Sequence, residues 1–302
     1  MKKFLSEILI DPSLVKSLIY DETQNVLHTD EHENIYEIIE EVPVILSSKI
    51  GASVTSPLHQ KLKTNFNYSE HYQKDAEVYN YFKEEENAAT RNEIRRLHEA
   101  IINAVPQDSR LILDVGCGNG WLANYFLKKN RQVISMDIST VNPVRVLKEN
   151  PHPNHAALVA DVYNNPIKNN SIDCIVAAEI MEHVHDPGLF IDRLLEKLKP
   201  GGKLVITTPY NEKLEYYLCI HCNLPTPKNA HLHTFNEQNI KAIIPDKAGN
   251  WRMKCFANKY LIKSRLNLVV SFLPFKVWKI IDALANAVFP SSTRFIIEII
   301  KK

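Results

Sequence analysis

A short apolar run that passes directly into a glycine-rich turn constrains this chain more than any other feature. The run is LILDV (Leu111–Val115), the turn is GCGNG (Gly116–Gly120), and a helix-like segment, WLANYFLKKN, follows. Glycines allow a sharp turn and a close approach of backbone to ligand, while the next helix offers free N–H groups. The spacing is G-x-G-x-G, one residue shorter than the turn that binds a pyrophosphate. We therefore expect a buried strand, a ligand-binding turn and a helix.

Strand-like apolar runs recur after Leu111, with helix-like segments between them. The runs are LILDV, QVISMDI, AALVADV, DCIVAAE, KLVITT, MKCFANKYLI and RFIIEII. This alternation predicts an α/β fold with a doubly wound, mostly parallel sheet. A chain of 302 residues has room for such a domain, here residues 106–302, and for a smaller unit before it.

Two acids stand where the next two strands end. Asp137 closes the second run, where a carboxylate can accept hydrogen bonds from both hydroxyls of a ribose. Asp161 closes the third run beside Val162, in position for an adenine amino group. Because parallel strands end at one edge of a sheet, these acids and the glycine turn predict a nucleoside pocket. The alternative is that the glycines and acids serve only turn geometry and helix capping.

With SIDCIVAAEIMEHVHDP and LKPGGKLVITTP, these motifs resemble the class I S-adenosylmethionine-dependent methyltransferases, in particular the methyltransferase-11-like members. The resemblance covers about residues 106–300. It implies a seven-stranded sheet whose last strand, TRFIIEIIKK, is antiparallel and inserted beside MKCFANKYLI. It also implies S-adenosylmethionine as cofactor. The residues that it places around the cofactor are Asp114, Gly116, Cys117, Gly118, Gly120, Asp137, Ile138, Asp161, Val162 and Ala178.

The acceptor decides the rest of the chemistry. A sulfonium methyl group is already activated, so the enzyme mainly aligns the acceptor and removes its proton. Nucleobase and glutamine N-methyltransferases carry Asn/Asp-Pro-Pro-aromatic where this chain has Ala178-Glu179-Ile180-Met181. The resemblance therefore favours O-methylation of a small-molecule, glycan or lipid-linked acceptor over N-methylation.

The segment Glu179–His183 carries a set of polar side chains at helical spacing. It is similar to the E-x-x-E-H motif of ubiquinone-biosynthesis O-methyltransferases and small-RNA 2′-O-methyltransferases, in which a metal orients the accepting hydroxyls and a later histidine completes the site. The resemblance implies the catalytic candidates Glu179, His183 and His231 and the ligands Glu179, Glu182, His183 and His231 for a divalent cation. His233 is an alternative to His231. Two other interpretations remain: His183 acts as a base or orienting group without metal, or the motif is structural.

A second metal site competes for the same histidines. Cys219 and Cys222 have C-x2-C spacing and precede His231 and His233, which permits structural zinc. Alternatively, these cysteines are ordinary packing groups in a cap insertion near residues 210–235.

Residues 1–50 resemble the zinc-ribbon-derived module that activates some methyltransferases, through ILIDP and EVPVIL. Where that module has C-P-x-C, this chain has Asp11-Pro12-Ser13-Leu14, and Thr29 and His32 stand near the second pair. We therefore expect a small zinc-free α+β module, either structural or partner-binding. Val42, Val44 and Leu46 alternate around Pro43, which predicts a short edge strand in a region otherwise poor in strands.

Residues 51–105 are predicted to be a linker followed by a helix. The linker opens with ASVTSPLHQ, and the helix has Ile94, Leu97, Ile101 and Ile102 on one face. The aromatic residues Tyr68, His71 and Tyr72 stand where relatives carry a cofactor lid, and surface packing of a helix is the alternative.

An apolar insertion near residues 264–290 precedes the last strand. One helical arc is predicted to pack on the body: Leu266, Val269, Val270, Leu273, Val277, Ile280, Leu284 and Val288. A second, aromatic face has Phe272, Phe275, Trp278 and Phe289. That face indicates a lipophilic acceptor, a peripheral membrane contact through 266–289 or a dimer contact, whereas burial on both faces is the alternative. Pro274 is expected to divide the segment into two helices.

The amino-acid composition limits the classes of partner that we expect this chain to bind. Lys+Arg 36 against Asp+Glu 35 leaves a net charge of +1, without the basic excess of a general nucleic-acid binder. Five cysteines, the absence of an export signal in MKKFLSEILIDPS, and the lack of an apolar run long enough to span a membrane favour the cytoplasm. Two other functions remain open: an RNA or protein methyltransferase docked through residues 1–50, and a non-catalytic cofactor-binding regulator.

Overall fold

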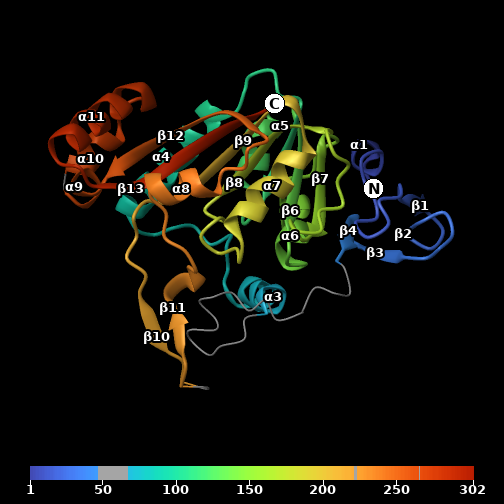
Figure 1. Ribbon diagram of the computed structural model, residues 1–302. Coiled ribbons are helices and arrows are strands. Elements are labelled where there is room, and N and C mark those ends of the chain that lie inside the picture. The colour runs from blue at the N-terminus through green and yellow to red at the C-terminus, as the bar shows by residue number, and fades with distance from the viewer. Residues whose placement is uncertain (47–66, 221–222, 265) are drawn as a thin grey trace.

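The computed structural model describes residues 1–46, 67–220, 223–264 and 266–302 (Figure 1). The strands of its main sheet are β1 (Ile19–Asp21), β2 (Val26–His28), β3 (Ile35–Ile39), β4 (Val42–Ile45), β5 (Leu111–Val115), β6 (Gln132–Asp137), β7 (His155–Ala160), β8 (Ile172–Ala178), β9 (Leu198–Pro209), β12 (Ala248–Asn258) and β13 (Ser292–Lys301). A separate hairpin consists of β10 (Tyr216–Leu218) and β11 (Pro225–Pro227). The helices are α1 (Lys3–Ser6), α3 (Tyr68–Val78), α4 (Ala88–Ala104), α5 (Trp121–Leu127), α6 (Val141–Glu149), α7 (Pro187–Lys197), the 3-10 helix η1 (Lys228–Ala230), α8 (Glu237–Ile243), α9 (Lys259–Lys263), α10 (Leu266–Ser271) and α11 (Phe275–Val288).

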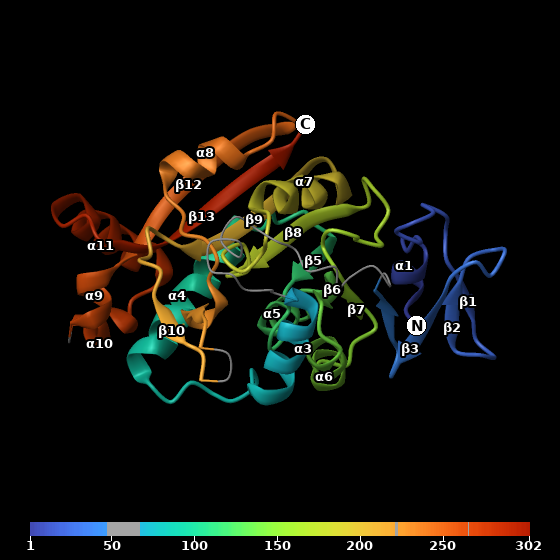
Figure 2. The same cartoon turned by 60° about the horizontal axis from the view of Figure 1, so that its bottom comes forward.

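The predicted seven-stranded sheet is confirmed. Its strand order is β7-β6-β5-β8-β9-β13-β12, and β13 runs antiparallel to both of its neighbours while the other pairs are parallel. Helices α7 and α8 lie on one side of this sheet and α4, α5 and α6 on the other (Figure 2). Because both faces are covered, every residue of the central strand β5 is buried.

The strand predicted over MKCFANKYLI was too long. β12 ends at Asn258, and residues 259–263 form α9 instead. The Asn258 side chain accepts hydrogen bonds from the backbone N–H groups of Tyr260 (3.0 Å) and Leu261 (3.3 Å). This side chain caps the new helix and so stops the strand.

The N-terminal region contains more strand than its sequence predicts. Strands β1 to β4 form an antiparallel meander, and β4 also pairs in parallel with β7. The prediction of an edge strand at β4 was therefore wrong, because β4 lies between β3 and β7 and joins the module to the main sheet. The prediction that the region is otherwise poor in strands was also wrong. β1 and β2 have three residues each, too few to display an alternating pattern.

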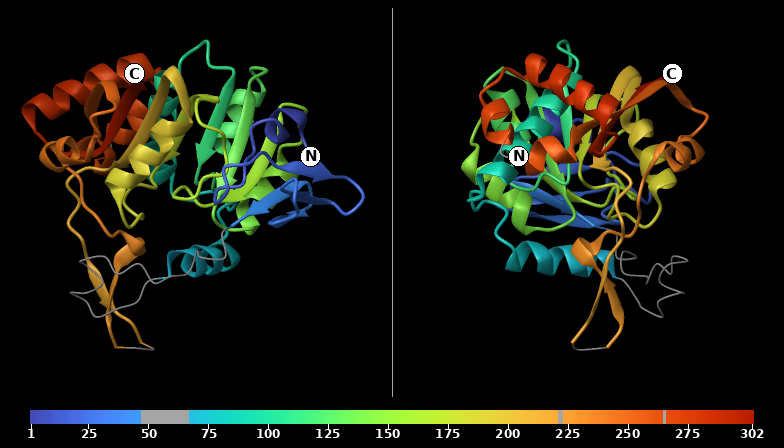
Figure 3. Two further views of the ribbon diagram at one scale, coloured as in Figure 1. Left: turned by 45° about the vertical axis from the view of Figure 1, so that its right-hand side comes forward. Right: turned by 90° about the vertical axis from the view of Figure 1, so that its left-hand side faces the viewer.

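The N-terminal module packs against the segment between β7 and β8. Residues 161–171, between β7 and β8, contain no helix. The module packs there instead: the Ile10 N–H donates to the Pro166 carbonyl (2.7 Å), and the Lys168 N–H donates to the Ile8 carbonyl (2.8 Å). Leu9 and Ile167 are fully buried in the same hydrophobic cluster. Figure 3 shows the module against the edge of the sheet.

Asp11 organises the turn of residues 11–14. Its Oδ1 accepts from the Ser13 N–H (2.8 Å), the Ser13 hydroxyl (2.7 Å) and the Leu14 N–H (2.9 Å). Its Oδ2 accepts from the Asn34 amide (2.7 Å) and the Tyr36 hydroxyl (3.0 Å). A buried carboxylate thus joins the two halves of the module through hydrogen bonds.

Replacing Asp11 with asparagine should lower the free energy of unfolding by about 2 kcal/mol, since an NH2 group would then face two donors. Burial raises the pKa of Asp11, but the hydrogen bonds from Ser13, Leu14 and Asn34 outweigh burial and hold the pKa below its usual value. The carboxylate therefore stabilises the fold fully above about pH 4, and this contribution is lost as the pH falls further. Guanidinium unfolding should show that the difference in free energy of unfolding between the wild type and Asp11→Asn is smaller at acid pH than at neutral pH. A difference in free energy of unfolding that does not change with pH would contradict this prediction.

Helix α4 exposes one residue that its periodicity assigns to the buried face. Ile94 is exposed, whereas Arg96 is buried. The Arg96 guanidinium donates to the carbonyls of Val270 and Leu273, both at 2.8 Å, and lies 5.1 Å from the centre of the Trp278 ring. These contacts hold α10 and α11 against α4.

The insertion of residues 264–290 exposes most of the arc that was predicted to pack on the body, and Phe272 and Phe289 of the aromatic face are exposed as well. Pro274 does separate α10 from α11, as expected. On the predicted packing arc, however, Val270 alone is buried, Leu273 is partly buried, and the other six residues are exposed. Trp278, from the predicted aromatic face, is buried against Arg96 and fixes the rotation of α11.

Candidate functional site

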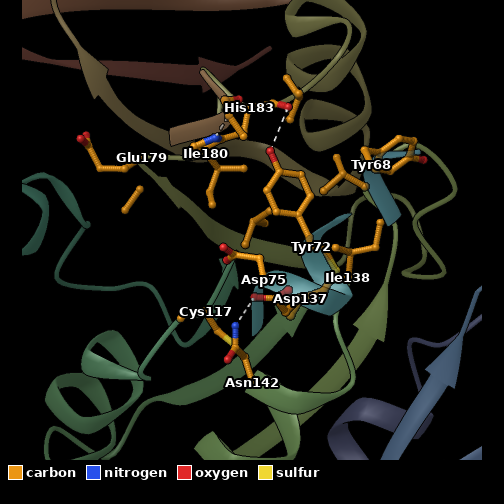
Figure 4. Close-up of a pocket in the computed structure, with 18 of the residues that line it drawn as sticks. Tyr68, Tyr72, Asp75, Cys117, Asp137, Ile138, Asn142, Glu179, Ile180 and His183 are labelled. Carbon is orange, nitrogen blue, oxygen red and sulfur yellow. Dashed lines mark hydrogen bonds between the residues drawn. The ribbon is translucent and has the colours of Figure 1, made fainter. Parts of the chain in front are cut away.

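A cavity of about 820 Å³ lies at the carboxyl ends of β5, β6, β7 and β8, with α3 across it (Figure 4). This is the edge at which ligands bind in doubly wound sheets. The predicted cofactor residues among its lining are Gly116, Cys117, Gly118, Asp137, Ile138, Asp161, Val162, Ala178 and Tyr72. Asp114 and Gly120, also predicted, do not line it.

The glycine turn meets the cavity in a conformation that side chains rarely adopt. Gly116 and Gly118 have φ of +71° and +50°. A Cβ atom on Gly116 would lie 2.2 Å from the Ile180 Cδ1 atom, so another residue there would displace the Ile180 side chain as well as strain the backbone. A Cβ atom on Gly118 would meet no atom closer than 4.0 Å, so the backbone there borders open space. That space is what a ligand in close contact with the turn requires.

Two carboxylates lie below the turn. Asp137 Oδ1 accepts from the Ser139 N–H at 3.0 Å, and its Oδ2 has a long contact of 3.4 Å with the Asn142 amide, which leaves acceptor capacity. Burial raises the pKa of Asp137, although these hydrogen bonds oppose the shift. Burial and the nearby Asp137 raise the pKa of Asp114 to about 7. Within the described residues, Asp114 Oδ2 has no hydrogen-bond partner.

The third carboxylate contacts the helix that covers the cavity. Asp161 Oδ2 accepts a hydrogen bond from the Tyr68 hydroxyl of α3, and its Oδ1 accepts from the Tyr163 N–H (3.0 Å). Tyr72, also on α3, points into the cavity toward His183, and its hydroxyl lies 3.4 Å from the His183 carbonyl (Figure 4). With His71 they line the cavity, so α3 is placed as a cover rather than as a remote surface helix.

Glu182, His183 and His231 meet at one side of the cavity. One ligand atom from each lies within 4.8 Å of the others. Two of these side chains each contact a further residue outside the group. Glu182 Oε2 accepts a hydrogen bond from the Thr208 hydroxyl (2.8 Å), and His231 Nδ1 lies 2.5 Å from Glu212 Oε2. Such outer contacts orient the ligands of metal sites.

His183 is held as a neutral imidazole. Burial, and then the neighbouring His231, lower the pKa of His183 to about 4. Its Nδ1 lies 3.3 Å from the Ala230 carbonyl, so Nε2 is the ring nitrogen left for another partner. A neutral imidazole can accept a proton or bind a metal. Burial and the nearby Glu179 raise the pKa of Glu182 well above its usual value.

Glu179 stands apart from this cluster. It lines the cavity, but its Oε2 lies 2.8 Å from Arg294 Nε of β13 in an ion pair, and it is not in the three-residue group. Burial raises the pKa of Glu179, and Arg294 opposes the shift. The structure thus brings together three of the four predicted ligands and pairs the fourth with an arginine.

The competing zinc site is only partly described. Cys222 lies outside the described residues, and Cys219 is partly buried. His233 Nε2 lies 2.9 Å from the Val184 carbonyl. Within the described part of the chain, Glu182, His183 and His231 form the only cluster with metal-binding spacing.

Several cavity residues were not predicted. Trp121 begins α5 directly after the glycine turn and stacks on His98, with ring centres 3.7 Å apart. Asn142 opens α6 and contacts Asp137. Tyr163 and His185 line the cavity beside Asp161, with ring centres 4.0 Å apart. For Trp121 and Tyr163 the available signal was a position close after the glycine turn or a strand, since residues there face the carboxyl edge.

Comparisons with known proteins agree with this geometry. A family model described as a methyltransferase domain matches residues 82–249. A ubiquinone biosynthesis O-methyltransferase from Nitrobacter winogradskyi is 37% identical over 101 residues, which are 32% of this chain and 38% of that protein. One from Rhodopseudomonas palustris is 32% identical over 32% of this chain and 39% of its own length. The chain therefore matches less than half the length of these curated relatives.

Solved structures share the fold. An S-adenosylmethionine-dependent methyltransferase from Mesorhizobium loti is 15% identical, with a TM-score of 0.50 over 68% of this chain and 98% of that one. One from Archaeoglobus fulgidus is 14% identical, with a TM-score of 0.50 over 70% and 94%. Since the family model spans more than half of the chain and the fold agrees, this protein belongs to the class I S-adenosylmethionine-dependent methyltransferases.

Proposed function

We propose that the protein transfers a methyl group from S-adenosylmethionine to an oxygen atom of a small-molecule, glycan or lipid-linked acceptor in the cytoplasm. The observation that carries this proposal is one cavity with a glycine turn and Asp137 on one side and His183 and His231 on the other. At about 820 Å³ it has room for a ligand of cofactor size together with part of an acceptor. The names of the curated relatives support oxygen as the acceptor atom.

The cofactor supplies the activated methyl group, and the chain supplies binding and position. Asp137 would accept hydrogen bonds from the ribose, Asp161 and the Val162 backbone would contact the adenine, and the glycine turn would hold the methionine portion. Asp114, also predicted there, does not line the cavity and would first have to become accessible. The open space beside Gly118 and the free acceptor capacity of Asp137 are the features that fit this ligand.

On the acceptor side, His183 is proposed to receive the proton of the accepting hydroxyl. It is buried and neutral, so its Nε2 can accept a proton, and its lowered pKa makes it a weaker base than an exposed histidine. The alternative is a divalent cation held by Glu182, His183 and His231, which would orient the same hydroxyl, because carboxylate and imidazole groups suit such ions. Nε2 of His183 would then bind the cation and could not receive the proton, since Nδ1 faces the Ala230 carbonyl. Glu179, the fourth predicted ligand, would first have to leave Arg294.

The alternative of an RNA or protein acceptor has less support. No lysine or arginine is among the described residues that line the cavity, whereas a basic patch there would favour RNA. The N-terminal module, proposed as a docking surface in that alternative, shares its buried leucines with the domain core.

The proposed function is tested with methyl-labelled cofactor. Cell extract incubated with the protein should yield a labelled small molecule, and mass spectrometry should locate the label on oxygen. Label on nitrogen, or on RNA or protein alone, would contradict the proposal. Binding of cofactor without any labelled product would favour the non-catalytic regulator.

Removing divalent cations tests the metal. Methyl transfer should fall by at least about tenfold in excess chelator and return with added Mg²⁺ or Zn²⁺, because a metal-oriented hydroxyl loses its position. In calorimetry, the Glu182→Gln variant should bind the ion more weakly than the control variant Glu215→Gln. Glu215 is exposed and precedes β10 of the separate hairpin. Full activity in excess chelator would exclude the metal and leave His183 to act alone.

A further inference from the structure

The outward face of α10 and α11 is an exposed apolar surface. Val277, Ile280, Leu284 and Val288 are spaced to form one stripe along α11, opposite the buried Trp278. Four further exposed apolar residues belong to α10 or to the ends of the two helices: Leu266, Val269, Phe272 and Phe289. These eight side chains, called here the helical-hairpin face, are between 43% and 89% exposed.

The surroundings of this face are strongly basic although the whole chain is nearly neutral. Residues 259–289 contain five basic residues and one acid, Asp282. Four of the basic residues are described and exposed: Lys259, Lys263, Lys276 and Lys279. No ion pair with an acid is found for these four lysines among the described residues. Asp282 is buried and accepts from the N–H groups of Ala257 and Asn258, so it does not offset them at the surface.

The fold holds this face in place at one end of the molecule. Helices α9, α10 and α11 lie beyond the edge strand β12, at the opposite end of the sheet from the N-terminal module (Figures 1 and 3). Arg96 fixes them through the carbonyls of Val270 and Leu273 and through Trp278. Within the described residues, no helix is long and apolar enough to cross a bilayer.

We propose that the helical-hairpin face binds the surface of an anionic bilayer. A short helix with an apolar stripe and neighbouring lysines suits this position: the stripe enters the headgroup boundary while the lysines meet lipid phosphates. Charge decides between this partner and a second copy of the chain. A face-to-face dimer would bring the lysines of the two copies together, and their repulsion opposes such pairing. The proposal does not rest on the proposed acceptor.

Vesicle flotation tests the proposal with the full chain. The wild-type protein should float with phosphatidylcholine vesicles that contain phosphatidylglycerol, and much less with phosphatidylcholine alone. Lys276→Gln with Lys279→Gln should weaken binding by about 30-fold, since each lysine near an anionic surface contributes about 1 kcal/mol. Ile280→Ser with Leu284→Ser should weaken it by at least that factor. Ile35→Ser and Lys241→Gln, exposed changes elsewhere, should bind as the wild type does.

Three results would overturn the proposal. The first is that the wild-type protein does not float with anionic vesicles. The second is that it floats, but neither double variant floats less. The third is that lipid binding is absent and sedimentation shows a dimer that Ile280→Ser with Leu284→Ser dissociates. Each variant should still bind S-adenosylhomocysteine, which reports folding. Because this readout and methyl transfer are independent of vesicles, failure of membrane binding is distinguishable from failure of the proposed function.

Discussion

Replacing Asp137 with alanine is expected to weaken binding of S-adenosylhomocysteine by at least about 100-fold. Two hydrogen bonds to a charged acceptor contribute about 1.5 kcal/mol each at the lower end, and both would be lost. The carboxylate is already oriented, because the Ser139 N–H and the Asn142 amide contact it at 3.0 and 3.4 Å. Titration calorimetry measures the change directly.

Two control variants sharpen this experiment. Asp137→Asn keeps one acceptor oxygen and removes the charge, so its affinity should fall between those of the wild type and Asp137→Ala. Asp246→Ala removes an exposed aspartate remote from the cavity and should leave affinity unchanged. A folded Asp137→Ala variant with wild-type affinity would show that the sugar of the cofactor is bound elsewhere.

Replacing His183 with alanine should lower methyl transfer by about 10²- to 10⁴-fold while affinity for S-adenosylhomocysteine stays at the wild-type level. The reason is the separation of the two sides of the cavity. In the proposed function Asp137 and the glycine turn bind the cofactor, whereas His183 lies with His231, their ring centres 4.9 Å apart. Single-turnover transfer of labelled methyl measures the first quantity and calorimetry the second.

His32→Ala is the matched control, since this exposed histidine belongs to the N-terminal module. Normal transfer by His183→Ala would remove the histidine from the chemistry. Loss of cofactor affinity together with transfer would instead assign His183 a structural role in the cavity wall. The outcome therefore separates the interpretations that the Glu179–His183 motif leaves open.

The meeting of the glycine turn, Asp137 and Asp161 at one cavity was predictable because these residues are local to their strands. Each strand supplies its own acid or glycine at its carboxyl end, as Asp137 and Asp161 do, and parallel pairing brings the ends together. A run such as LILDV is apolar throughout because both faces of its strand are covered. Sequence and structure agree where a short segment determines its own place.

Long-range pairing accounts for what the sequence did not predict. The ion pair of Glu179 needs Arg294 on the last strand, and no pattern near residue 179 indicates it. The rotation of α11 is similar, since the helix is apolar on more than one side and the buried Arg96 on α4 selects Trp278 for the interior. Periodicity identifies an amphipathic helix but does not say which partner covers it.

A crystal structure with S-adenosylhomocysteine tests most directly whether the cofactor lies where the parallel strands end. The expected density lies beside Gly118, with the ribose hydroxyls within hydrogen-bond distance of the Asp137 carboxylate and the sulfur facing His183. An empty cavity at saturating ligand, or ligand density at any other place on the chain, would contradict the account.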